Sequence, residues 1–189
     1  MKILSICGSP RRGNSETILL ELQKLFKERG IENEVVLLRE KKIERCHGCV
    51  ENCNPAGVCC QHDDVEEILD KMVASDGIIY ISPNYFQMPT GLLKDFMDRS
   101  SVAFASGRAK NLENKKSAVI CVGTDEIKEI DVCVDNIANL YCQYFGKVVV
   151  KKSFRTHSEL KGNYNDIFEN DLNPDIRASL GSIVEALLK

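Results

Sequence analysis

The sequence predicts an α/β protein built on a doubly wound, five-stranded parallel sheet with helices on both faces. Two observations predict it: short apolar runs alternate with amphipathic segments, and the central runs are apolar at nearly every position. Strands that are buried on both faces of a parallel sheet have this continuous apolar pattern. Right-handed crossovers then place the connecting helices on both sides of the sheet.

The first half of the chain supplies three strands and two helices. The expected strands are the apolar runs at 2–7, 34–38 and 77–81. The helix after the first strand repeats apolar residues at 3.6-residue spacing and is closed by Gly30. The helix before the third strand begins at the acidic pair Asp63 and Asp64, which complements the helix dipole.

The second half continues the alternation. The expected elements are helix 90–103, strand 117–122, helix 125–145, strand 147–150 and helix 174–188. The last helix has apolar residues on one face, so it should cover the sheet. We expect a single domain over residues 1–189, in which 46–60 is an inserted cysteine-rich loop and 151–189 is a C-terminal extension.

Charge and hydropathy exclude two classes of partner. The 25 basic and 28 acidic residues give a net charge of -3, which offers no basic face for nucleic acid. The apolar runs are far shorter than the ~20 residues that a spanning helix needs, so no membrane-spanning segment is expected. The first residues lack the pattern of a secretory signal and lead directly into a strand, and we therefore expect a cytoplasmic protein.

Residues 8–17 lie where the first strand leads into the first helix. Gly8 and Gly13 let the backbone bend closely around an anion, and the helix start offers unpaired N–H groups. Asn14 stands where a P-loop has the lysine that reaches the outer phosphates, which disfavours ATP or GTP hydrolysis. The G-x-G-x-x-G dinucleotide pattern is also absent, so a single terminal phosphate, as in FMN, is favoured. A glycine/proline turn with an Asn cap is the simpler alternative.

A second loop, residues 82–91, follows the third strand at the carboxyl edge, where open α/β sheets bind ligands. A flavin ring needs backbone donors and acceptors along its polar edge and a flat apolar contact. A proline-bounded turn with Tyr85 and Phe86 can supply both. Alternatively, these two aromatic residues only pack the end of the strand.

Three motifs together resemble the NADPH-dependent FMN reductase family. They are Gly8-Ser9-Pro10-Arg11 with Gly13-Asn14-Ser15, then Ser82-Pro83-Asn84-Tyr85-Phe86, and then Leu93-Lys94-Asp95-Phe96-Met97-Asp98-Arg99. The cysteine-rich segment is more narrowly similar to the iron-sulfur flavoprotein branch of that family. The resemblance spans residues 1–150 and implies a flavodoxin-like fold and association into homodimers or homotetramers.

The resemblance also implies where FMN is held. It places the phosphate at Ser9, Arg11, Gly13, Asn14, Ser15 and Thr17. It places the isoalloxazine near Pro83, Asn84, Tyr85, Phe86, Gln87 and Met88, with Gly123 and Thr124 in a third loop. That third loop departs from the family, which commonly has a Gly-Gly-Gln-Glu run there. We expect no catalytic side chain, because the flavin carries the chemistry.

Five of the nine cysteines crowd into 15 positions, at Cys46, Cys49, Cys53, Cys59 and Cys60. Cys46, Cys49, Cys53 and Cys59 could ligate a 4Fe-4S cluster, with Cys60 spare. The same four sulfurs could hold zinc, or the thiols could remain without metal. Three residues separate Cys49 from Cys53, where the family usually has two. The other four cysteines are expected to fill the core, at Cys7, Cys121, Cys133 and Cys142.

Several functions remain open at this point. The iron-sulfur flavoprotein resemblance implies that electrons pass between the cluster and FMN, with ferredoxin, NAD(P)H or a quinone as donor or acceptor. Without the cluster, the family resemblance implies an NAD(P)H-dependent FMN or quinone reductase. A flavodoxin-like carrier is a third possibility, although a net charge of -3 gives little of the acidic docking face that such a carrier needs. A flavin-free cysteine sensor is the fourth.

Overall fold

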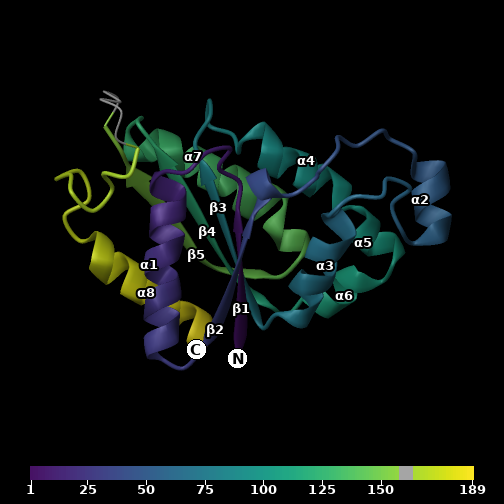
Figure 1. Cartoon of the computed structure of the whole chain (residues 1–189), viewed down its shortest axis with the longest axis horizontal. Coiled ribbons are helices and arrows are strands. Elements are labelled where there is room, and N and C mark those ends of the chain that lie inside the picture. The colour runs from purple at the N-terminus through teal and green to yellow at the C-terminus, as the bar shows by residue number, and fades with distance from the viewer. Residues whose placement is uncertain (158–163) are drawn as a thin grey trace.

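The computed structural model describes residues 1–157 and 164–189, and its centre is a five-stranded parallel sheet. The strands are β1 (Lys2–Cys7), β2 (Glu32–Leu37), β3 (Gly77–Pro83), β4 (Lys116–Gly123) and β5 (Lys147–Arg155). Their order across the sheet is β2-β1-β3-β4-β5, and each neighbouring pair is parallel (Figure 1). This is the flavodoxin-like order, so the predicted fold class is confirmed.

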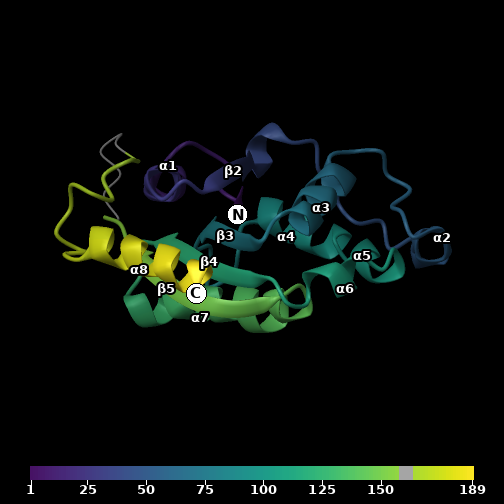
Figure 2. The ribbon, with the colours of Figure 1, turned by 90° about the horizontal axis from the view of Figure 1, so that it is seen from below.

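Helices cover both faces of the sheet (Figure 2). They are α1 (Asn14–Glu28), α2 (Val50–Ala56), α3 (Val65–Ala74), α4 (Gly91–Arg99), α5 (Val102–Ala105), α6 (Arg108–Leu112), α7 (Ile127–Leu140) and α8 (Ile176–Leu188), with single turns η1 (Leu38–Glu40) and η2 (Cys142–Tyr144). α1 and α8 pack on one face, and α3, α4 and α7 pack on the other.

Each face of the sheet has its own hydrophobic core because successive strand residues point to opposite sides. In β1, Leu4 and Ile6 pack beneath α3 and α4, whereas Ile3 and Cys7 pack beneath α1 and α8. The four isolated cysteines are each at most 1% exposed, which confirms the prediction that they fill the core. The two cores fix the sheet, and its carboxyl edge is left for the loops.

The bounds of some elements differ from those predicted. β5 continues to Arg155, five residues beyond its predicted end at residue 150. It lies at the sheet edge, where exposed and half-buried residues alternate, so no continuous apolar run in the sequence indicates its full length. The segments predicted as helices 90–103 and 125–145 are each interrupted, with α4 ending at Arg99 and α7 at Leu140. α2 lies in the loop that was expected to be irregular; it has no buried residue, so no apolar pattern announces it.

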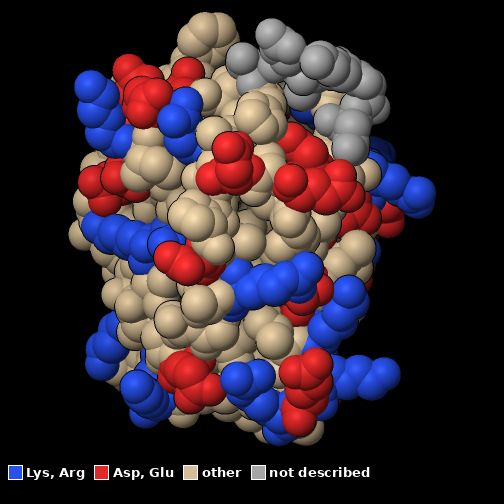
Figure 3. Space-filling model, turned by 90° about the vertical axis from the view of Figure 1, so that its left-hand side faces the viewer, with Lys and Arg blue, Asp and Glu red and all other residues tan. Residues whose placement is uncertain are grey.

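Charged groups of both signs are interspersed on the face that carries α1 and α8 (Figure 3). That pattern agrees with the small net charge of -3 and provides no continuous basic surface on this face. Among the described helices, none combines the length and the apolar character that crossing a bilayer requires.

Candidate functional site

The carboxyl ends of β1, β3 and β4 open onto a pocket of about 450 Å³. Its wall is formed by Ser9, Arg11, Gly13, Asn14, Ser15, Pro83, Tyr85, Val122, Thr124, Thr156 and Tyr164. Both predicted loops, and Thr124 of the third, therefore meet around one cavity. This is the position at which a doubly wound sheet binds its ligand, since the loops after β1 and β3 diverge there.

The first loop joins β1 to α1 and presents backbone donors. The Ser9 hydroxyl donates to the Arg11 carbonyl at 2.7 Å, which shapes the loop from within. No described side chain caps α1, so its first N–H groups remain available to an anion. Gly8 has a packing role instead, because a Cβ there would lie 2.6 Å from the Leu93 Cβ.

The second loop contains a tight turn at residues 85–88. Tyr85 and Met88 exchange two backbone hydrogen bonds of 3.0 Å, and Phe86 and Gln87 both have positive φ, at 53° and 63°. This is a type I′ turn, a conformation that glycine and asparagine usually occupy. The turn directs Phe86 fully into solvent, while Pro83 and Tyr85 face the pocket.

Asn84 and Gly123 join the second and third loops. The Asn84 amide donates to Asp125 at 2.6 Å, and its backbone N–H donates to the Val122 carbonyl at 2.7 Å. A Cβ on Gly123 would lie 2.9 Å from the Asn84 Cβ, so only glycine allows this approach. Neither residue lines the pocket, and nor do Thr17, Phe86, Gln87 and Met88 of the expected set. The structure thus separates pocket-lining residues from those that lie beside the pocket.

Three pocket residues were not singled out from the sequence: Val122, Thr156 and Tyr164. Val122 lies near the end of β4, and Thr156 follows the last residue of β5, where its N–H donates to the Gly123 carbonyl at 2.7 Å. Because the sequence predicted that this strand ends at residue 150, Thr156 was not expected at the pocket. Tyr164 lies in a polar stretch without periodicity, so no local sequence pattern predicts that it lines the pocket.

Residues 1–157 of the chain match the model of the NADPH-dependent FMN reductase family. The chain belongs to this family. It is accordingly a flavin-dependent oxidoreductase, as the motifs of the first two loops predicted. The flavin reductase match covers every segment of the pocket except Tyr164.

Related sequences and structures agree with the family assignment. An iron-sulfur flavoprotein of Methanocaldococcus jannaschii is 37% identical over 145 residues, covering 75% of this chain and 72% of that protein. One from Methanosarcina thermophila is 39% identical over 126 residues, covering 65% and 63%. Among solved structures, a flavone reductase superposes with a TM-score of 0.69 at 24% identity, over 100% of this chain and 64% of the other. An NAD(P)H:quinone oxidoreductase from Methanothermobacter marburgensis gives 0.68 at 17%, over 97% and 98%.

The cysteine-rich segment lies at the opposite end of the molecule from residues 164–173 (Figures 1 and 2). The sulfurs of Cys49 and Cys60 are 3.1 Å apart, and Cys59 is 8% exposed. Cys46 is exposed, and Cys53 is partly buried in α2. Over residues 1–157 and 164–189, no three His, Cys, Asp or Glu side chains are close enough to hold one metal ion. As they lie here, the thiols do not form a metal-binding arrangement.

Electrostatics within the segment favour neutral thiols at two positions. The hydrogen bond that Cys60 shares with Cys49, followed by burial, raises the pKa of Cys60 to about 11. Desolvation, with the nearby Cys49 and Cys59, raises the pKa of Cys53 as well. A thiol bound to iron or zinc must lose its proton, so metal uptake by this segment would release protons to solvent.

Proposed function

We propose that this chain binds FMN in the pocket at the carboxyl edge of the sheet and uses it to pass electrons from NAD(P)H to a small-molecule acceptor such as a quinone. The observation that carries the proposal is the two-sided character of the pocket. One side has the uncapped start of α1 and Arg11, and the other has the flat surfaces of Pro83 and Tyr85. FMN has a phosphate for the first side and an aromatic ring for the second.

The residues present fit FMN in charge and size. Arg11 is the charged side chain among the described residues that line the pocket, so an anion meets no carboxylate there. A phosphate at the start of α1 is stabilised by the helix dipole and by unpaired N–H groups. The pocket volume of about 450 Å³ lies within the range of roughly 300–1,000 Å³ that is usual for small-molecule sites.

Bound FMN supplies the hydride and electron chemistry, and the protein supplies position and environment. Pro83, Tyr85 and Val122 give the ring end an apolar boundary, which limits access of water. The hydroxyls of Thr124 and Thr156 offer polar partners at the same end. The hydrogen bond from Asn84 to Asp125 fixes the second loop against the third.

Turnover with nicotinamide tests the enzymatic part of this proposal. FMN-loaded protein should oxidise NADH or NADPH anaerobically when a quinone is present, in proportion to the quinone reduced. Arg11→Ala should raise the FMN concentration needed for half-maximal rate by at least about tenfold, because a charge-assisted contact is worth about 1.5–3 kcal/mol. Arg12→Ala is the matched control, since Arg12 is exposed and lies outside the pocket. Stable FMN binding without turnover would instead support a flavodoxin-like carrier.

The cysteine-rich segment is proposed to take up a 4Fe-4S cluster through Cys46, Cys49, Cys53 and Cys59. Relatives named iron-sulfur flavoproteins and the crowding of five thiols support this assignment. The described positions of the sulfurs oppose it unless the segment rearranges on loading. Anaerobic reconstitution followed by elemental analysis should give about four iron and four sulfide per chain. Bound zinc, or no metal, would contradict it.

Substitution of single cysteines separates these ligands from their neighbours. Serine at any of the four proposed positions should lower iron content, whereas Cys60→Ser should not. A requirement for Cys60 in place of Cys59 would reassign the fourth ligand.

The remaining partner proposals concern protein contacts. Ferredoxin is the proposed donor if the cluster is present, and reduction of the purified protein by reduced ferredoxin tests it. We also propose a homodimer or homotetramer, supported by the exposed apolar side chains of Phe86 and Leu140, at 100% and 66%. Light scattering of the eluted protein gives the mass directly, and a monomer would contradict the proposal.

A further inference from the structure

The loop between β1 and α1, residues 8–13, is proposed to hold the FMN phosphate and is called the phosphate loop below. This loop and the start of α1 contact residues 164–167, about 150 positions further along the chain. The Asn14 amide donates to the Asp166 carboxylate at 2.8 Å, and Ile167 N–H donates to the Asn14 side-chain oxygen at 3.0 Å. Both ends of the Asn14 amide are therefore used within the protein. The Thr17 hydroxyl lies 3.0 Å from the Asn165 side-chain oxygen. Residues 164–167 thus touch the start of α1 at several points.

This contact is anchored by burial. Ile167 is 0% exposed and packs in the core beneath α1 and α8. A Cβ on Gly13 would lie 3.1 Å from the Tyr164 carbonyl oxygen, so the segment also lies close to the backbone of the phosphate loop. Residues 164–167 are consequently held against the loop by packing as well as by hydrogen bonds.

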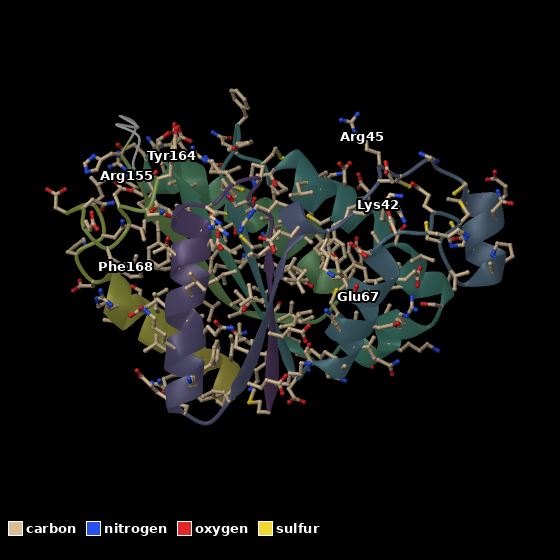
Figure 4. All side chains as sticks on the ribbon, in the orientation of Figure 1. Lys42, Arg45, Glu67, Arg155, Tyr164 and Phe168 are labelled. Carbon is tan, nitrogen blue, oxygen red and sulfur yellow. The ribbon has the colours of Figure 1, made fainter. Side chains whose placement is uncertain are left out.

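Tyr164 completes the arrangement by contacting the pocket cation. The Arg11 guanidinium carbon lies 3.7 Å from the centre of the Tyr164 ring, and both side chains line the pocket. Figure 4 shows Tyr164 beside the start of α1, at the same end of the molecule as Arg155. An arginine side chain has about 1.5–2 kcal/mol of rotamer entropy to lose on ordering, and a stacked ring removes part of that freedom in advance.

We propose that residues 164–167 form an additional cofactor-binding segment, in which Tyr164 positions the Arg11 guanidinium for the FMN phosphate. This rests on the proposed function and extends it beyond the loops after β1, β3 and β4. Preorganisation increases affinity because fewer side chains must be ordered on binding. Tyr164 acts through Arg11, and Arg11 acts on the phosphate. The effect of Tyr164 should therefore be specific to flavins that carry a phosphate.

Comparison of FMN with riboflavin, which lacks the phosphate, provides the test. Tyr164→Ala should weaken FMN binding about fivefold, as judged by flavin fluorescence, and leave riboflavin binding within about twofold. Tyr164→Phe should restore FMN affinity because it keeps the ring over Arg11. In an Arg11→Ala background, Tyr164→Ala should have no further effect, since coupled residues are not additive.

The chain offers a matched control for this series. Phe168 also stacks with an arginine, 4.7 Å from Arg177, but neither residue lines the pocket. Phe168→Ala should therefore leave FMN affinity unchanged. Circular dichroism of each variant checks that it is folded.

Two results would overturn the proposal: an unchanged FMN affinity in Tyr164→Ala, or equal losses for FMN and riboflavin. Either result would leave the proposed function standing, provided that the unmodified chain binds FMN. Failure of the unmodified chain to bind FMN would contradict the proposed function itself.

Discussion

Arg99 is a long charged side chain that the core encloses almost completely, with 2% of it exposed. Its guanidinium makes two hydrogen bonds to the Asp63 carboxylate, at 2.8 and 2.9 Å, and one of 2.8 Å to the Glu44 carbonyl. Its Nε donates to the Cys59 sulfur at 3.2 Å. One residue of α4 thereby ties down both ends of the cysteine-rich segment.

Removal of this guanidinium should be costly for stability. Arg99→Met leaves the Asp63 carboxylate, 1% exposed, without its counter-ion, and the free energy of unfolding should fall by about 3–5 kcal/mol in urea titrations. Lys94→Met on the same helix breaks the exposed pair with Asp98 and should cost less than about 1 kcal/mol. Equal losses in the two variants would show that the buried pair has no special weight.

The same pair predicts an acid dependence of stability. Burial alone would raise the pKa of Asp63, but the hydrogen bonds from Arg99, Glu44 and Val65 lower it below its ordinary value. A carboxylate with a lowered pKa stabilises the fold fully above its unfolded value of about 3.9, and this contribution is lost as pH falls through the folded pKa. Unfolding followed below about pH 4 should therefore show a shallower acid loss in Asp63→Asn than in the unmodified chain. Parallel acid limbs would contradict this.

Among elements, the turn at residues 85–88 departs most from what its sequence favours. Phe86 and Gln87 are the non-glycine residues with positive φ in the described part of the chain. Strained backbone of this kind is concentrated at binding loops, where surrounding contacts hold it. Here the Asn136 amide donates to the Gln87 carbonyl at 2.9 Å, and this bond fixes the turn against α7.

Relief of that strain should stabilise the protein. Gln87→Gly keeps the carbonyl that Asn136 uses and removes a left-handed cost of about 1–2 kcal/mol, less the entropy that glycine loses on folding, for a net gain of about 0.5 kcal/mol. Gln143→Gly in η2 is the matched control, because Gln143 is exposed and has no positive φ. It should lower the melting temperature, whereas Gln87→Gly should raise it. A fall in both variants would mean that the turn is unstrained.

Most strands and helices could be predicted from their apolar patterns, whereas β5 was predicted only in part and α2 was not predicted. β1 and β3 could be predicted because nearly every residue in them is buried, which gives a continuous apolar run in the sequence. The second half of β5 was not predicted, because Lys151 and Lys152 interrupt the apolar pattern of this edge strand. α2 carries Pro55 and has no fully buried residue, so no apolar pattern in the sequence predicts this helix.

At the scale of the whole molecule, the sequence predicted that residues 9–15 lie at the binding pocket, but it did not predict the segment that packs against them. Residues 9–15 carry a local pattern of glycine and hydroxyl residues at a strand–helix junction. Tyr164 and Asp166 are brought to the pocket by contacts with Arg11 and Asn14, which lie about 150 positions earlier. Contacts at such separation depend on the finished fold and leave no periodic signal along the chain.

A comparison of FMN binding with riboflavin binding tests whether the pocket holds a flavin through its phosphate. Quenching of the visible flavin fluorescence reports the binding of either flavin. If the start of α1 and Arg11 hold a phosphate, FMN should bind at least about tenfold more tightly than riboflavin. Equal affinities for the two flavins, or no uptake of FMN by anaerobically prepared protein, would contradict phosphate-dependent FMN binding at this site.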